Sequence, residues 1–551
     1  MTTQPEKAIE SNRPLGDSRL RRERHHGDRV VACHTVRPPN LAALLAEAVA
    51  SGAQREALVC GERRYRWSQV DALARRVAGG LAAAGVVPGD RVALLLGNDC
   101  EFVLAMLGAT LAGAVVVPIG TREQAPGIAY ILGHCGAKVL VHEAALADRL
   151  PSAADVPALT VRVAVGAAVA GALSFAALAQ ADPLAQAHDP HEDETAAILY
   201  TSGTTGRPKG AMLTHLGIVH SATVYRDAFA LGAPDRIAAV VPLSHVTGLV
   251  ALLAVALRVG GALIVVPAFN ACEFLGLAAR ERMSFTLMVP AMYSLVLMQP
   301  DFASHDLSAW RIGGFGGAPM APAVIDDLAQ RLPGLALSNC YGATETTSPV
   351  TIMPAALTRA HLASVGRAVP GADIVVMDDD GRECPPGETG EIWLRGPMVV
   401  PGYWADPTAT ADNFCAGFWR SGDLGAVDAE GFLVVQDRMK DMLNRGGYKI
   451  FSVEVENVLC LHADVLEAAV VGRPCPVLGE RVHAFVTGRP GRAPQAEVLR
   501  AFCATRLADY KVPESVTVGT EPLPRNANGK LLKRTLRERL RREDEPDPAA
   551  R

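Results

Sequence analysis

The sequence lacks a large excess of charge of either sign. Lysine and arginine total 53 residues against 58 aspartates and glutamates, which gives a net charge of −5 with histidine neutral. Proteins that bind nucleic acid carry a basic surface, so this balance argues against nucleic acid as the main partner. Aromatic residues are also few, at 5%. Because 49% of the residues are hydrophobic, alanine, valine and leucine supply enough apolar volume for large cores.

Paired cysteine motifs, a signal peptide and a long apolar run are lacking as well. The eleven cysteines are scattered without a CxxC pair, which predicts reduced thiols in the cytoplasm and neither a disulfide framework nor a zinc site. The uncharged run 163–179 is at the short limit for a membrane span and favours a buried strand plus helix, so we expect no integral membrane segment. Residues 1–35 and 537–551 lack apolar periodicity and predict disordered tails.

The pattern of apolar, glycine and proline residues along the chain predicts two structured domains. From about 40 to 430, short apolar strands alternate with alanine-rich helical patterns, which is typical of parallel sheets covered by helices. After Trp393, glycines, prolines and β-type runs dominate. Beyond about 440 a separate α+β unit of ordinary domain size follows. We predict a large domain over 36–438 and a small one over 439–536.

The stretch YTSGTTGRPKG, residues 200–210, predicts an anion-binding loop. Its glycines let the backbone turn tightly, while its hydroxyls and Lys209 add donors and a positive charge. The spacing is not that of a Walker A motif, and a glycine-rich surface loop is the alternative on composition alone. Residues 196–200 resemble a buried strand and 211–215 begin an apolar helical pattern. A strand, a glycine loop and a helix in this order favour phosphate binding.

Five further motifs are weak when taken singly. They are GGFGGAP (313–319), NCYGATET (339–346), WRSGDL (419–424), DRMKD (437–441) and PLPRNANGK (522–530). A tight turn, a helix start, a solvated turn aspartate, a charged linker and a surface lysine are the respective structural alternatives.

Taken together with YTSGTTGRPKG (200–210) and PLSHVTG (242–248), these motifs resemble, in order and spacing, the acyl-adenylate-forming (AMP-binding) superfamily. The resemblance covers about residues 40–535. Within the superfamily, the sequence is similar to 4-coumarate-CoA ligases and fatty-acid-CoA ligases. It implies an α/β fold, with a large N-terminal domain of helix-covered, mostly parallel sheets plus a β-barrel-like subdomain, and a small mobile α+β C-terminal domain.

The resemblance also implies the roles of individual residues. Lys530, Glu345, Thr344, His245 and Lys440 would take part in catalysis, with Glu345 as the ligand of Mg²⁺. The implied ATP-binding residues are Thr201, Ser202, Gly203, Thr204, Thr205, Gly206, Lys209, Gly317, Ala318, Pro319, Asn339, Tyr341, Gly342, Asp423 and Arg438. The implied acyl pocket is formed by His245, Thr247, Gly314, Gly316, Thr347, Ser348 and Pro349. CoA would meet Arg445, Gly446 and Gly447.

The same resemblance implies two arrangements of the small domain. Rotation at the hinge, at or next to Lys440, would withdraw Lys530 after adenylation and bring Arg445 and its two glycines to the site. One departure from the family concerns this region, because Ser452 stands where proline is common. It removes no catalytic group but leaves the path of the chain after the hinge open.

The substrates are predicted as a class. The PLSHVTG stretch lacks the aspartate that would pair with an amino acid's ammonium group, so a fatty or aromatic acid is expected instead. The small residues of the implied acyl pocket suggest room beyond the carboxylate. The sequence ends 21 residues after Lys530, so we expect no carrier-protein domain and CoA as the acceptor.

Two alternatives stay open. One is a stand-alone acyl-AMP ligase that loads a separate carrier protein, and the other is a nucleotide-binding regulatory protein that has lost catalysis. A homodimer also stays open, because the sequence does not specify an oligomeric state.

Overall fold

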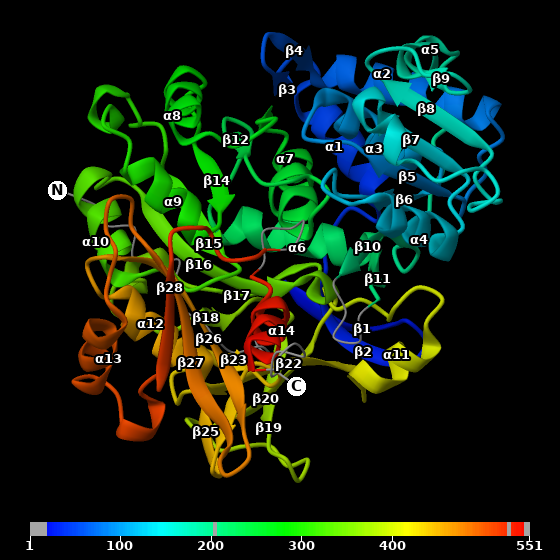
Figure 1. The fold of residues 1–551 in the computed structure, drawn as a ribbon. Helices are drawn as coiled ribbons and strands as arrows, with labels where there is room; N and C mark the ends of the chain where they lie inside the picture. Colours follow the sequence, from blue (N-terminus) through cyan, green and yellow to red (C-terminus); the bar gives the residue numbers. More distant parts are fainter. Residues whose placement is uncertain (1–18, 202–206, 526–530, 545–551) are drawn as a thin grey trace. The chain divides into compact units, whose positions relative to one another are not determined.

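The computed structural model describes residues 19–201, 207–525 and 531–544 (Figure 1). The chain divides into two compact units. Unit 1 comprises Met1–Ile374, Trp393–Arg420 and Gly431–Leu433, and unit 2 comprises Val375–Ile392, Ser421–Glu430 and Val434–Arg551. The boundary predicted between residues 438 and 439 stays a prediction, and each unit is described by itself.

Unit 1 contains one sheet with the strand order β11-β10-β6-β5-β7-β8-β9. Its strands are β5 (Arg91–Leu95), β6 (Val115–Pro118), β7 (Val139–Glu143), β8 (Val161–Val165), β9 (Leu173–Ser174), β10 (Thr195–Thr201) and β11 (Lys209–Thr214). The pairs from β6 through β9 are parallel. The central strands are continuous apolar runs because both of their faces are buried. The associated helices are α2 (Trp67–Ala83), α3 (Cys100–Leu111), α4 (Ala125–Cys135) and α5 (Phe175–Gln180).

A second sheet of unit 1 runs in the order β18-β17-β16-β15-β14-β12-β13-β3-β4 (Figure 1). Its strands are β3 (Glu56–Cys60), β4 (Arg63–Arg66), β12 (Arg236–Ala239), β13 (Ala262–Val265), β14 (Phe285–Met288), β15 (Ile312–Gly316), β16 (Ala336–Ala343), β17 (Ser348–Ile352) and β18 (Gly366–Ala368). The pairs from β16 to β3 are parallel, which confirms the predicted fold class. The helices are α1 (Leu41–Gly52), α6 (His215–Ala228), α7 (Val255–Val259), α8 (Ala271–Arg280), α9 (Pro290–Leu297) and α10 (Pro322–Arg331).

A β-hairpin precedes these sheets. Strands β1 (Leu20–His25) and β2 (Arg29–His34) pair antiparallel within the stretch that was predicted to be a disordered tail, so that prediction is wrong for residues 20–34. Arg37 holds the hairpin to unit 1, because its guanidinium donates to Glu23 at 2.5 Å and to Glu192 at 2.8 Å. On β2, Val31 and Cys33 are buried, but β1 (LRRERH) is dominated by charged side chains, so the hairpin shows little of the apolar alternation by which strands are recognised.

Unit 2 contains a sheet with the order β25-β24-β27-β26, in which β28 also pairs with β27. Its strands are β24 (Leu443–Arg445), β25 (Tyr448–Ile450), β26 (Val465–Cys475), β27 (Gly479–Gly488) and β28 (Ser515–Gly519), and its helices are α12 (Ser452–Cys460), α13 (Ala496–Ala504) and α14 (Lys533–Asp544). Apolar side chains of α12, α13 and the sheet form one core. Helix α14 continues to residue 544, so the predicted tail from 537 is wrong over 537–544.

The β-type runs around residues 373–438 form strands whose residues are divided between the two units. These are β19 (Asp373–Met377), β20 (Gly390–Arg395), β22 (Phe418–Val427) and β23 (Phe432–Arg438), with α11 (Pro407–Asn413) and β21 (Phe414–Cys415) before β22. Within unit 1, β18 pairs with the start of β23.

Cysteine pairing differs from the sequence expectation. Cys60 and Cys100 form a disulfide with a Cα–Cα distance of 6.1 Å, so the prediction of reduced thiols throughout is wrong at this pair. The two cysteines are 40 residues apart, and they meet because the end of β3 adjoins the start of α3, which no local motif reveals. Among the helices in the described part of the chain, none has the length and apolar content that crossing a bilayer requires.

Candidate active site

The glycine loop joins two antiparallel strands of unit 1. Thr201 ends β10, Lys209 begins β11, and the two residues are partners in the register. The helix expected from residue 211 begins only at His215, because residues 211–214 pair with β10 as a strand. A short apolar run is compatible with either structure. The predicted residues Ser202, Gly203, Thr204, Thr205 and Gly206 lie outside the described residues.

Helix α4 anchors both ends of the loop. The Tyr130 hydroxyl donates to the Pro208 carbonyl oxygen at 3.0 Å, and the Tyr200 hydroxyl lies 2.8 Å from His134 Nδ1. Burial raises the pKa of Tyr200, so its hydroxyl stays neutral. The described residues at the two ends of the loop are therefore held by contacts with α4.

Glu345 lies beside the first of these fixed points. It follows β16 in a short 3₁₀ turn (Thr344–Thr346) and is only 9% exposed. Its Oε1 accepts from the Thr201 hydroxyl at 3.4 Å and from the Tyr403 hydroxyl at 3.1 Å. A buried carboxylate next to hydroxyl oxygens is a set of hard oxygen donors, so the residues present fit Mg²⁺. The fold thus brings Thr201 and Glu345 together, as the resemblance implied.

The backbone after Glu345 is in an unusual conformation. Thr347 and Ser348 have φ angles of 48° and 91°, which side-chain-bearing residues rarely adopt. Thr346 stabilises the turn, because its hydroxyl donates to the Ser348 carbonyl at 2.9 Å and accepts from the Ala343 N–H at 2.8 Å. Such local strain is concentrated at functional sites. Here it reverses the chain directly after the predicted metal ligand.

The residues predicted to bind adenine follow two adjacent parallel strands. Gly317, Ala318 and Pro319 are exposed immediately after β15, whereas Asn339 and Tyr341 are half-buried on β16. Carboxyl ends of neighbouring parallel strands form the usual ligand crevice of α/β sheets. Gly342 is required by packing, because an added Cβ would lie 1.8 Å from the Ser348 carbonyl oxygen. Thr344 is half-buried at the start of the turn.

The residues predicted to form the acyl pocket differ in burial and in the space beside them. Thr347, Ser348 and Pro349 are buried, and His245 and Thr247 are half-buried, with Thr247 beginning a π-helical segment, η2 (Thr247–Ala254). The two glycines of β15 do not provide open space on their side-chain side. A Cβ on Gly314 would lie 2.9 Å from Leu287 Cγ, and one on Gly316 would lie 2.3 Å from the Cys340 carbonyl oxygen. Their small size is therefore explained by close packing between strands.

In unit 2, the two predicted ribose contacts meet each other. Arg438 Nε lies 3.4 Å from Asp423 Oδ1, and Asp423 is buried. The Asp423 N–H donates to the Ser421 hydroxyl at 3.0 Å, which fixes the turn that carries the carboxylate. A carboxylate next to a guanidinium is a suitable pair for hydroxyl groups of a sugar.

The predicted hinge in unit 2 is held by a buried polar network. Asp437 Oδ2 accepts from both the N–H and the hydroxyl of Ser452, the hydroxyl at 2.7 Å. Lys533 Nζ donates to the Ser452 hydroxyl at 2.6 Å and pairs with Glu456 Oε1 at 2.6 Å. Burial raises the pKa of Glu456, against the opposing effect of Lys533. Ser452, the departure from the family pattern, is thus the centre of this network.

Helix α14 also contacts the hinge directly. The Arg537 guanidinium donates to the Lys440 carbonyl oxygen at 3.1 Å and to Asp441 Oδ1 at 2.8 Å. The Lys440 side chain itself is exposed. Lys530, the predicted catalytic lysine, lies outside the described residues, three positions before α14 begins.

The residues predicted to meet CoA form a hairpin turn between β24 and β25. Gly446 and Gly447 have φ angles of 58° and 92°, so the turn itself requires glycine. Arg445 pairs with Glu514, its Nη2 lying 2.7 Å from Oε1. These glycines therefore have a structural explanation that is independent of any ligand.

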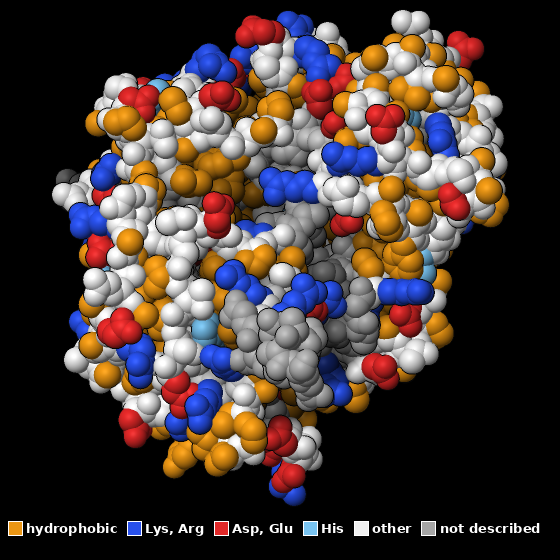
Figure 2. All heavy atoms as spheres, viewed as in Figure 1, with side chains coloured by type: hydrophobic (Ala, Val, Ile, Leu, Met, Phe, Trp, Pro, Cys, Tyr) orange, Lys and Arg blue, Asp and Glu red, His pale blue; other side chains and the backbone are white. Residues whose placement is uncertain are grey.

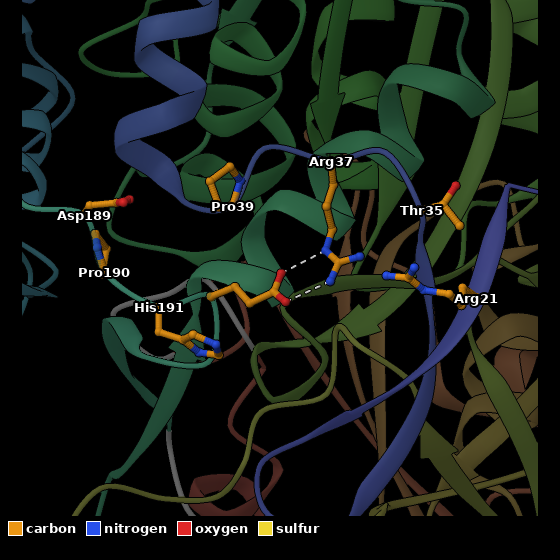
Figure 3. Close-up of a pocket in the computed structure, with 8 residues that line it drawn as sticks. Arg21, Thr35, Arg37, Pro39, Asp189, Pro190 and His191 are labelled. Atoms are coloured by element: carbon orange, nitrogen blue, oxygen red, sulfur yellow. Dashed lines mark hydrogen bonds and ion pairs between the residues drawn. The ribbon is translucent and has the colours of Figure 1, made fainter.

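Unit 1 has a cavity away from the predicted residues. It has a volume of about 540 Å³ and is lined by Arg21, Thr35, Arg37, Pro39, Asp189, Pro190, His191 and Glu192 (Figure 3). Figure 3 shows the Arg37 guanidinium directed at a carboxylate, which belongs to Glu192. Arg37, with Arg21, also lowers the pKa of Glu23 to about 2. Because Arg37 pairs both with Glu192 in the wall and with Glu23 of β1, this cavity is a structural junction of the hairpin.

Acidic and basic side chains are interspersed over much of the face in Figure 2. This agrees with the near balance of charge in the sequence.

Sequence reasoning missed Tyr403. It lies in PGYW (401–404), between β20 and α11, and its hydroxyl reaches Glu345 across 58 positions of sequence. A lone tyrosine beside a glycine carries no local signal, so only the fold reveals the contact.

Comparisons with known proteins agree with this geometry. Residues 45–404 match the family of AMP-binding enzymes, and residues 454–530 match the C-terminal domain of AMP-binding enzymes. A long-chain-fatty-acid–CoA ligase, FadD13, from Mycobacterium tuberculosis is 35% identical over 86% of this chain and 93% of that protein. A feruloyl-CoA synthase from Amycolatopsis sp is 37% identical over 87% of this chain and 95% of that protein. The solved structure of the anthranilate CoA ligase AuaEII with anthranoyl-AMP superposes with a TM-score of 0.84 at 27% identity, covering 91% of this chain and 97% of that one.

Proposed function

Because the chain belongs to the family of AMP-binding enzymes, we propose that it is an ATP-dependent acid–thiol ligase, an acyl-CoA synthetase. It activates a carboxylic acid to acyl-AMP with release of pyrophosphate and then transfers the acyl group to CoA. The observation that carries the proposal is the meeting of Glu345 with Thr201, which sets a buried carboxylate at the end of the glycine loop.

The first half-reaction joins two anions. A substrate carboxylate oxygen attacks the α-phosphorus of ATP, and pyrophosphate leaves. Lys530 is assigned to the carboxylate and the α-phosphate, and Lys209 with its loop to the departing phosphates. Mg²⁺ bound at Glu345 would supply further positive charge at the phosphates. Preorganised charge of this kind is usually the largest contribution to such catalysis.

The nucleoside is assigned to two sets of residues. Tyr341 offers a flat ring to the base, and Asn339 an amide to its exocyclic amino group. Asp423 and Arg438 are assigned to the ribose hydroxyls, and their mutual contact at 3.4 Å supports a shared role.

The second half-reaction needs the thiol of CoA to attack the acyl carbonyl, releasing AMP. Rotation at Lys440 would exchange Lys530 for the Arg445–Gly447 turn at the acyl adenylate. The contacts of Arg537 with Lys440 and Asp441 link α14 to this segment, which supports a hinge at Lys440.

The acid is proposed to be fatty or aromatic. The stretch 242–248 has no carboxylate for an ammonium group, which supports the exclusion of α-amino acids. Relatives act on both classes, as the names FadD13, a long-chain-fatty-acid ligase, and feruloyl-CoA synthase indicate.

The test is acid-dependent ATP–pyrophosphate exchange, followed by thioester formation with CoA. The panel contains fatty acids of graded length, cinnamate- and benzoate-type acids, and α-amino acids. We expect exchange with at least one fatty or aromatic acid and stronger exchange there than with any amino acid. Exchange without thioester formation would favour a carrier protein as the acceptor, and no exchange with any acid would reject the proposal.

A further inference from the structure

Tyr403 touches two predicted functional groups at once. Its side chain is 5% exposed, and its hydroxyl donates to Glu345 Oε1 at 3.1 Å. The Lys209 ammonium lies over the face of its ring, 5.0 Å from the ring centre. One residue thus lies between the carboxylate assigned to Mg²⁺ and the lysine assigned to the phosphates.

The backbone around Tyr403 is fixed on the side of the glycine loop. The Trp404 N–H donates to the Gly210 carbonyl oxygen at 2.7 Å, and the Met212 N–H donates to the Gly402 carbonyl oxygen at 3.2 Å. Tyr403 also forms an antiparallel bridge with Ala211 on β11. The segment that carries Tyr403 therefore extends the strand that returns from the loop.

The same segment is fixed on the side of Glu345. The Val400 N–H donates to the Glu345 carbonyl oxygen at 2.9 Å. Arg29 of the N-terminal hairpin donates to the carbonyl oxygens of Val400 and Pro401, each at 2.8 Å. The rings of Phe414 and Tyr403 pack in a T-shaped arrangement, with ring centres 5.8 Å apart. The Tyr403 ring therefore has little freedom to turn.

The chemistry of tyrosine suits both contacts. The Tyr403 hydroxyl donates to Glu345 as a neutral group, because a phenol is uncharged near neutral pH. It can therefore hold the carboxylate without neutralising the charge that a metal needs. The ring face attracts the Lys209 ammonium but carries no formal charge, so the full positive charge remains available for phosphate. A carboxylate partner would have cancelled that charge.

We propose that Tyr403 is a positioning residue that fixes the metal-binding carboxylate of Glu345 and the phosphate-binding ammonium of Lys209 relative to each other. This inference rests on the proposed function, because it takes the roles of those two residues from it. Tyr403 acts through these two neighbours and is not assigned a contact with nucleotide or metal.

The experiment separates the hydroxyl from the ring. Tyr403→Phe keeps the ring and the packing but removes the contact with Glu345, whereas Tyr403→Leu removes both contacts. Titration calorimetry of the full-length protein gives the Kd of ATP with Mg²⁺ and with EDTA. The ratio of the two Kd values measures the metal contribution and needs no turnover.

For Tyr403→Phe we expect the Mg²⁺ enhancement of ATP binding to fall about tenfold, as for other groups that orient a metal ligand. Binding of ATP in EDTA should stay unchanged. For Tyr403→Leu, binding in EDTA should weaken severalfold as well, because Lys209 loses the ring face. Tyr65→Phe, on β4 outside the site, serves as the control for loss of a tyrosine hydroxyl and should match the wild type.

Three results would contradict either the positioning role of Tyr403 or the proposed role of Glu345. An unchanged Mg²⁺ enhancement in Tyr403→Phe, with a wild-type melting temperature, overturns the positioning role. Equal losses with and without Mg²⁺ in Tyr403→Phe, together with a lowered melting temperature, reduce Tyr403 to a packing role and also overturn it. If Glu345→Ala retains the full Mg²⁺ enhancement, the proposed role of Glu345 fails instead.

Discussion

Ser452 provides a prediction whose size follows from the contacts of the hinge network. In Ser452→Ala the hydroxyl is lost, and with it the bonds to Asp437 at 2.7 Å and from Lys533 at 2.6 Å. Hydrogen bonds to charged groups contribute roughly 1.5–3 kcal/mol each, but Lys533 keeps Glu456 and Asp437 keeps the Ser452 N–H. We therefore expect a loss of about 2 kcal/mol in local stability.

Ser452→Pro is the sharper variant, because it restores the residue that is common in the family. Ser452 is the first residue of α12, where proline is tolerated, so the substitution should not destabilise the helix itself. Proline, however, also removes the N–H that donates to Asp437. The loss should exceed that of Ser452→Ala by about 1.5 kcal/mol or more.

Hydrogen exchange followed by mass spectrometry is the assay, because a chain with two compact units need not unfold in one step. A loss of 2 kcal/mol corresponds to roughly 30-fold faster exchange in peptides covering β23 and α12. Thr505→Ala, which removes an exposed hydroxyl in the same unit, should leave those peptides unchanged. Wild-type exchange in Ser452→Pro would refute the reasoning that this network stabilises the hinge.

Three further predictions concern other parts of the chain. Glu345→Ala should lower ATP–pyrophosphate exchange by at least about 10² with the fold intact, and exchange at the wild-type rate in a folded variant would reject its assignment. Lys530→Ala should slow adenylation by about 10²–10³ while thioester formation from pre-made acyl adenylate persists, and Lys440→Pro should do the reverse; equal loss of both steps in each variant would contradict the hinge. Burial lowers the pKa of His215 to about 4, so unfolding takes up a proton between pH 6.5 and 4 and the free energy of unfolding should fall by about 3 kcal/mol across that window. His215→Gln should flatten this pH dependence, and an unaltered slope would show that another group is responsible.

Much of the fold could be predicted because it is encoded locally. The buried strand β5 is a run of apolar residues, and α1 and α2 carry helical periodicity, so alternation alone indicated helix-covered parallel sheets. The end of β11, residues 211–214, was misread as the beginning of a helix because a short, mostly apolar run fits both structures. The β1–β2 hairpin was missed because β1 is mostly charged and because the hairpin is stabilised by Arg37, which lies outside it.

The candidate site could be predicted only as far as its motifs are contiguous. Glu345 and Thr201 belong to recognisable stretches, and the structure shows that they meet. The contacts of Tyr403 and Ser452 could not be predicted, because the residues they bind are remote from them in the sequence. The close contacts that an added Cβ on Gly314 or Gly316 would make could not be predicted for a related reason, since the atoms involved belong to neighbouring strands.

The most direct test of the proposed function follows one oxygen atom. The chain is incubated with ATP, CoA and an activated acid whose carboxylate carries oxygen-18, and the products are analysed by mass spectrometry. If the carboxylate attacks the α-phosphorus and the thiol then attacks the acyl carbon, the AMP released with the thioester carries one labelled oxygen and the pyrophosphate carries none. Label in pyrophosphate or inorganic phosphate, or formation of ADP in place of AMP, would contradict the account.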